Sequence, residues 1–127
     1  MKLATIHFDG GGLSPGPVTA ACTVQFSDGS LKEDVKRFDQ GTHNIAEWQA
    51  LMLGLRIALK HGERHVVVKG DSMLVVKQIN REWKTKNEAL RSLSAPAEEL
   101  LARFETWRVE WIPGEENRRT DKLGRSQ

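Results

Sequence analysis

The sequence is poor in cysteine and contains no long hydrophobic run. Its single cysteine, Cys22, cannot form a disulfide within the chain, and a lone cysteine in an apolar stretch fits a reducing compartment. The first residues, MKLATIHF, are too short and too polar for a signal peptide, and no stretch approaches the length of a transmembrane helix. We therefore expect a soluble, cytoplasmic monomer with no membrane partner.

Internal repeats, low-complexity tracts and linkers are also missing. The 127 residues fit one domain, residues 1–127, and with 39% hydrophobic residues that domain can bury a core without disulfides or structural metal. The net charge of +2 can hide an uneven distribution of charge over the surface. If four of the 17 acidic residues cluster at one site, the rest of the molecule carries 13 acidic and 19 basic residues. Such a surface suits a polyanion bound through its phosphates, although an ordinary mixed surface explains the net charge equally well.

The first third of the chain has the periodicity of β-strands. Residues 2–9 alternate apolar and polar side chains, and residues 10–17, GGGLSPGP, form a glycine- and proline-rich loop. Residues 18–26 and 30–38 flank Asp28-Gly29, which is a strong signal for a hairpin turn. These patterns predict a three-stranded antiparallel meander.

The remainder alternates helical and strand patterns. We predict helices at 44–60, 72–81 and 88–103, a short helix after Asn117, and strands at 64–69 and 106–112. Strand–helix–strand units imply parallel pairing through right-handed crossovers. The predicted fold is therefore α/β, with a mixed five-stranded sheet of three antiparallel strands followed by parallel strands and flanked by helices. Trp48, Trp107 and Trp111 are predicted to lie in its core.

One carboxylate occupies a position where a core residue is expected. The first predicted helix has an apolar stripe through Leu51 and Leu55, and the position one turn earlier on that stripe is Glu47. A carboxylate directed at a core costs about several kcal/mol unless it is paired. Glu47 therefore has either a buried arginine partner or a functional role.

Three more carboxylates follow the expected ends of elements. Asp9 ends the first strand, Asp71 ends a valine-rich strand, and Asp121 opens the last helix. Taken singly, each has an ordinary interpretation as a turn residue, a helix N-cap or a first-turn acid. If the two strands are neighbours, Asp9 and Asp71 meet at one sheet edge, and the first helix can bring Glu47 there. Hard oxygen ligands without a histidine or cysteine cluster suit Mg²⁺ or Mn²⁺, and two such ions about 4 Å apart can clamp a phosphodiester.

These residues lie in segments that resemble the type 1 ribonuclease H family over nearly the whole chain. The segments are HFDGGG (7–12), THNIAEWQALMLGL (42–55), VVVKGDSMLVVKQINREWKTKN (66–87) and IPGEENRRTDKL (112–123), of which the second and third are the most specific. The resemblance implies a ribonuclease H-like fold. It places the family's catalytic and metal-binding carboxylates at Asp9, Glu47, Asp71 and Asp121.

The resemblance also implies an activity and a set of substrate contacts. It predicts a metal-dependent endonuclease that hydrolyses the RNA strand of RNA–DNA hybrids with two Mg²⁺ ions, or Mn²⁺ as substitute, and leaves 5′-phosphates. Double-stranded RNA is a second candidate substrate. Either Thr42 or Asn44 can instead simply cap the helix. The predicted substrate-binding residues are Gly10, Gly11, Ser14, Thr42, Asn44, Lys84 and Asn117.

Three features depart from the family pattern. The opening loop, DGGGLSPGP, is one residue shorter than usual and has Ser14 where asparagine is common. The loop before Asp121 has no histidine, and only REWKTKN (81–87) replaces a long basic protrusion. These departures leave open a catalytically weak module that binds hybrids or double strands. A different nuclease on this fold, such as a junction resolvase, is disfavoured by the residues around Glu47 and Asp71.

Overall fold

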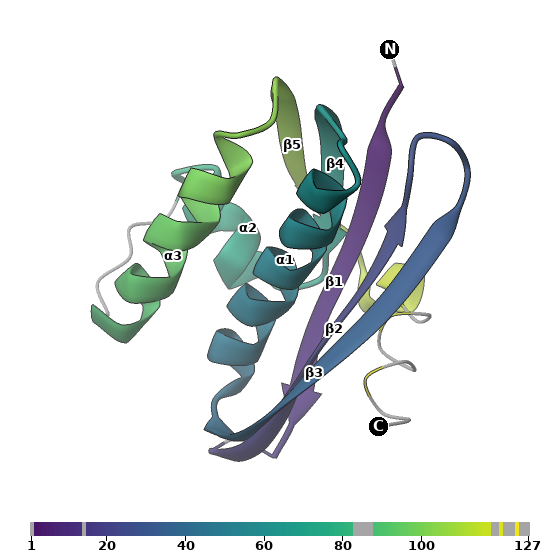
Figure 1. Ribbon diagram of the computed structural model, residues 1–127. Helices are drawn as coiled ribbons and strands as arrows, with labels where there is room; N and C mark the ends of the chain where they lie inside the picture. Colours follow the sequence, from purple (N-terminus) through teal and green to yellow (C-terminus); the bar gives the residue numbers. More distant parts are fainter. Residues whose placement is uncertain (1, 14, 83–87, 118–119, 121–123, 125–127) are drawn as a thin grey trace.

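The computed structural model describes residues 2–13, 15–82, 88–117, 120 and 124 (Figure 1). Ser14, Lys84 and Asp121, three of the predicted site residues, lie outside these ranges. Among the described helices, none is long and apolar enough to cross a membrane. The elements in chain order are β1 (Ala4–Gly12), β2 (Gly16–Gln25), β3 (Leu31–Gly41), α1 (His43–Lys60), β4 (His65–Gly70), α2 (Met73–Ile79), α3 (Glu88–Leu101), β5 (Thr106–Trp111) and the 3₁₀ turn η1 (Gly114–Asn117).

The five strands form one mixed sheet, as the sequence predicts. Their order is β3-β2-β1-β4-β5, with β2 antiparallel to both β1 and β3, and β4 parallel to both β1 and β5. The first and fourth strands are therefore adjacent in the middle of the sheet. This adjacency was the condition for Asp9 and Asp71 to meet, and it is fulfilled.

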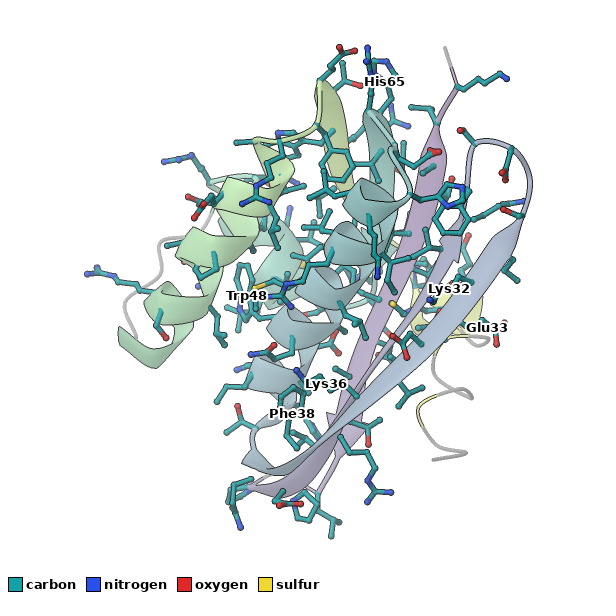
Figure 2. The ribbon with its side chains drawn as sticks, viewed as in Figure 1. Lys32, Glu33, Lys36, Phe38, Trp48 and His65 are labelled. Atoms are coloured by element: carbon teal, nitrogen blue, oxygen red, sulfur yellow. The ribbon has the colours of Figure 1, made fainter. Side chains whose placement is uncertain are left out.

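Side chains cover the sheet on both faces. Figure 1 shows α1 and α3 on one face, whereas η1 lies on the other. On the helical face, alternate residues of β2 such as Cys22 join a core that includes the fully buried Trp48 of α1 (Figure 2). On the opposite face, the Thr23 hydroxyl lies 3.3 Å from that of Thr120. Burial, and secondarily the charge of Asp34, raises the pKa of the Cys22 thiol to about 12, so this cysteine is an unreactive core residue.

Helix α1 lies unusually close to β1, because a glycine faces the strand. A Cβ atom on Gly54 would lie 2.5 Å from Cγ2 of Ile6, a distance that packed atoms do not adopt. The helix begins at His43, with the Thr42 hydroxyl accepting a hydrogen bond from the Ile45 amide. The start and the path of α1 together determine where its first-turn side chains meet the sheet.

The glycine-rich segment and two of the tryptophans depart from their predictions. The glycine-rich segment is mostly strand, because β1 continues to Gly12 and β2 resumes at Gly16, where pairing with β3 shifts register. Glycine lacks a side chain but still supplies the backbone groups of an antiparallel ladder. Trp107 and Trp111 are 40% and 44% exposed, not buried. They lie on β5, an edge strand, and an edge strand has no neighbouring strand on its outer side to cover its side chains. Most of the helix predicted after Asn117 lies outside the described part of the chain.

Candidate active site

The parallel pairing of β1 and β4 brings two carboxylates to one edge. The last paired residues are Phe8 and Gly70, so the next residue on each strand is an aspartate, Asp9 or Asp71. Beyond this point β1 continues alone with β2, and Asp9 pairs with Ala21. Asp9 was predicted to end its strand, and this prediction is wrong. Asp9 lies within β1, at the point where the parallel neighbour β4 ends.

Helix α1 supplies the third carboxylate. Gly10 packs directly against the first turn of the helix, since a Cβ atom there would lie 2.4 Å from the backbone nitrogen of Glu47. The Glu47 side chain is only 8% exposed, which confirms that it continues the buried stripe of the helix. One oxygen of each of Asp9, Glu47 and Asp71 lies within 4.8 Å of the others.

No cation neutralises the buried Glu47 side chain within the described residues. None of the ion pairs formed there includes Glu47, and its buried Oε2 atom has no hydrogen-bond partner among these residues. The alternative of a buried arginine partner is thus not supported. An orphaned carboxylate oxygen beside two aspartates is instead what a divalent cation site presents.

The environment of Glu47 favours its neutral form. Burial is the largest cause, followed by the negative charge of Asp9, and together with the weaker effect of Asp71 they raise the pKa of Glu47 from 4.5 to about 9. A hydrogen bond from the Gly10 backbone opposes the shift but does not cancel it. In the absence of a cation, the cluster therefore retains a proton at neutral pH.

This pKa shift makes stability depend on pH. Between 4.5 and about 9, native Glu47 holds a proton that the unfolded chain has released, so its contribution to stability is lost as pH rises through that window. Glu47→Gln mimics the protonated form and avoids this loss. We expect the variant and wild type to have equal stability in EDTA near about pH 5, and the variant to gain on the order of 2–4 kcal/mol by about pH 8.

Urea unfolding at several pH values measures this difference. Glu63→Gln is the matched control, because Glu63 is a carboxylate on the chain beyond α1 that bonds Ser27 and takes no part in the cluster. Equal stability of wild type and Glu47→Gln across the whole pH range would show that Glu47 ionises normally.

Hydrogen bonds to backbone carbonyl groups fix the chain at or beside each of the two aspartates. Ser72, not Asp71, caps α2 by accepting a hydrogen bond from the Val75 amide, so the interpretation of Asp71 as an N-cap is wrong. The indole Nε1 of Trp111 donates to the Asp71 carbonyl at 3.1 Å. The sequence does not reveal this role of Trp111, apart from its position at the end of a strand predicted after a helix.

Asn117 supports the neighbouring aspartate in the same way. Its amide donates to the Phe8 carbonyl at 2.9 Å, just before Asp9, and the residue is 1% exposed. This burial favours a positioning role over direct contact with a substrate. The hydrogen bond ties the C-terminal part of the chain to β1 beside the carboxylates.

The other predicted substrate-binding residues in the described part surround the start of α1. Thr42 caps the helix, and Asn44 is exposed in its first turn. Gly10 is tightly packed against α1, whereas a Cβ atom on Gly11 would have no neighbour within 4 Å. The structure therefore assigns Gly10 to packing and leaves Gly11 and Asn44 at an accessible surface.

Comparison with known proteins gives a consistent family assignment. A family model described as reverse transcriptase-like matches residues 19–126. The chain is 36% identical over 121 residues to the bifunctional protein Rv2228c of Mycobacterium tuberculosis, covering 93% of this chain and 33% of that protein. It is 34% identical over 119 residues to ribonuclease HI of Halobacterium salinarum, covering 92% of this chain and 60% of that protein. The chain thus spans only a part of the length of these curated relatives.

Solved structures agree with the sequence matches. The N-terminal RNase H domain of Rv2228c superimposes with a TM-score of 0.93 at 32% identity, covering 99% of this chain and 93% of that one. LC11-RNase H1, solved in complex with an RNA/DNA hybrid, gives a TM-score of 0.88 at 26% identity, covering 97% and 94%. Fold and carboxylate cluster together define an α/β domain of the ribonuclease H-like class. Within that class, the chain belongs to the type 1 ribonuclease H family.

Proposed function

We propose that this protein is a ribonuclease H, an endonuclease that hydrolyses the RNA strand of RNA–DNA hybrids and leaves 5′-phosphate ends. The convergence of Asp9, Glu47 and Asp71 within 4.8 Å carries the proposal. It is supported by family membership and by the hybrid bound to LC11-RNase H1, a structural neighbour. The proposed location is the cytoplasm, and the proposed functional unit is a monomer of the single domain 1–127.

The donor set fits divalent cations of the magnesium type. All three side chains offer hard carboxylate oxygens, and the orphaned Oε2 of Glu47 lies in the cluster. We propose that Asp9, Glu47 and Asp71 hold two Mg²⁺ ions together with Asp121, and that Mn²⁺ can replace Mg²⁺. When bound, such ions activate water and stabilise the charge that develops on the phosphodiester oxygens.

The residues of the chain supply position and selectivity. The first turn of α1 directs Glu47 inward, where its carboxylate can accept a hydrogen bond from a ribose 2′-hydroxyl, the group that distinguishes RNA from DNA. Asn44 and Gly11 offer polar contacts to the strand at the surface beside the cluster. Thr42 orients this surface by capping the helix. Ser14 and Lys84 complete the proposed set of contacts, whereas Asn117 positions β1.

Metal binding is expected to stabilise the folded protein. Cations neutralise the charge of the carboxylate cluster, and a ligand at about 100 times its Kd adds about 2.7 kcal/mol. We therefore expect the melting temperature to rise by a few degrees in millimolar Mg²⁺, and to rise less in Glu47→Gln. Differential scanning fluorimetry with KCl of matched ionic strength as control tests this. Equal melting in MgCl₂ and KCl would argue against a preformed cation site.

The direct test of function is cleavage of an end-labelled RNA–DNA hybrid in Mg²⁺ or EDTA. We expect the RNA strand alone to be cut, only with the metal, and to carry 5′-phosphates at the new ends. Double-stranded RNA and double-stranded DNA of the same sequence define selectivity. Hybrid binding without any cutting in Mg²⁺ or Mn²⁺ would favour the alternative of a catalytically weak binding module. The shortened opening loop is the sequence feature that supports this alternative.

A further inference from the structure

A hydrogen bond connects the β1–β2 corner to the start of α1. The Nε2 atom of His43, the first helical residue, lies 2.6 Å from the Gly12 carbonyl oxygen. The two residues are 31 positions apart in the chain, and Figure 1 shows the corner and the helix start at the same end of the sheet. Because a carbonyl oxygen only accepts, Nε2 must carry the hydrogen. In this arrangement Nε2 cannot act as a general base.

The corner has a conformation that needs support. Gly12 has a φ of 111°, and a Cβ atom there would lie 2.6 Å from the Pro17 carbonyl oxygen. The Leu13 amide donates to that same carbonyl at 2.9 Å and so closes the turn. The pairing of β1 with β2 ends at Gly12 and Val18, and Gly12 is exposed. A contact from α1 to Gly12 therefore helps to keep the corner against the helix.

Gly10 and His43 attach the same segment to α1 at two points. Gly10 packs on the backbone of Ala46 and Glu47, and Gly12 is held by the His43 side chain one helical turn earlier. Gly11 lies between these two attachment points, and Asn44 is exposed in the first turn of the helix. Two attachments determine both the distance and the orientation of the corner relative to the helix.

We propose that His43 is a positioning residue that clamps the shortened β1–β2 corner to α1 and so sets the shape of the substrate-binding surface beside the carboxylates. The expected effect of His43 on substrate binding rests on the proposed function. The clamp itself exists in the free protein, and its failure can therefore be distinguished from failure of the proposed activity.

The test compares His43→Leu, which has no donor, with His43→Gln, whose amide nitrogen reaches about as far as Nε2. Amide hydrogen exchange of Leu13 reports closure of the corner without substrate, and the Phe26 amide, bonded to Ser30 in the other hairpin turn, is the reference for a turn away from the corner. We expect Leu13 exchange to become about three- to tenfold faster in His43→Leu with Phe26 unchanged, and to be restored in His43→Gln. His65→Leu, a histidine change on β4, should leave Leu13 unaffected.

Kinetics on the hybrid provide the second measurement. We expect His43→Leu to raise KM about three- to tenfold with kcat within about twofold of wild type, and His43→Gln to restore KM. Unchanged Leu13 exchange in His43→Leu, or a glutamine variant as impaired as the leucine variant, would overturn the proposal. If the wild type cuts no hybrid, the proposed function fails, and the exchange comparison still decides whether the clamp exists.

Discussion

Replacing Asp71 with asparagine is expected to abolish cleavage of the hybrid while leaving the fold intact. Asparagine keeps the size of the side chain but removes a negative charge from a cluster whose ligand atoms lie within 4.8 Å of one another. Two clustered cations need that charge, and losing several kcal/mol of transition-state stabilisation corresponds to about a thousandfold lower rate or more. Single-turnover cleavage of the labelled RNA strand measures the effect.

Stability separates a chemical effect from misfolding. The charge of Asp71 is one of the causes that raise the pKa of Glu47, so Asp71→Asn should melt in EDTA at or above the temperature of the wild type. Asp39→Asn makes the same chemical change at an exposed position of β3 and should cleave normally. Wild-type rates in Asp71→Asn would mean that the cluster is not the catalytic centre. If the variant and the wild type both bind the hybrid without cutting it, the binding-module alternative gains support.

The second large effect is expected at Gly10. In Gly10→Ala the new Cβ would lie 2.4 Å from the backbone nitrogen of Glu47 and 2.5 Å from the backbone carbon of Ala46. Backbone atoms cannot rotate away as a flexible side chain can, so α1 must move off β1. We expect a loss of about 2–3 kcal/mol of stability. Because the movement displaces Glu47 from the aspartates, we also expect a loss of activity of about a hundredfold or more.

Gly11→Ala is the matched control for stability. A Cβ at Gly11 meets no atom within 4 Å, so the substitution should change the free energy of unfolding by less than about 0.5 kcal/mol. Urea unfolding of the two variants side by side tests the packing argument. If Gly10→Ala were as stable as Gly11→Ala, the close contact between β1 and the first turn of α1 would be wrong.

Elements whose burial leaves a local period in the sequence were predicted correctly. Alternation identified the strands of the meander, and the valine run of 66–68 identified a strand buried within the sheet, which is β4. The stripe of α1 placed Glu47 inward before any contact was known. The glycine loop was predicted too long, because glycine weakens strand propensity without preventing strand pairing. Trp107 and Trp111 were wrongly predicted to lie in the core, because an apolar side chain does not reveal whether its strand lies at the sheet edge.

By itself, then, the sequence determined the α/β class, the inward direction of Glu47 and the carboxylate type of the site. These follow from short-range periodicity and from side-chain chemistry, which the chain carries locally. Only the tertiary structure decided that Asp9 and Asp71 are neighbours, that Gly10 serves packing, and that Trp111, Asn117 and His43 hold backbone carbonyls near the site. Those contacts join residues far apart in the chain, and they depend on strand order and on how closely α1 approaches β1. The raised pKa of Glu47 has the same origin, because burial and nearby charges act through space.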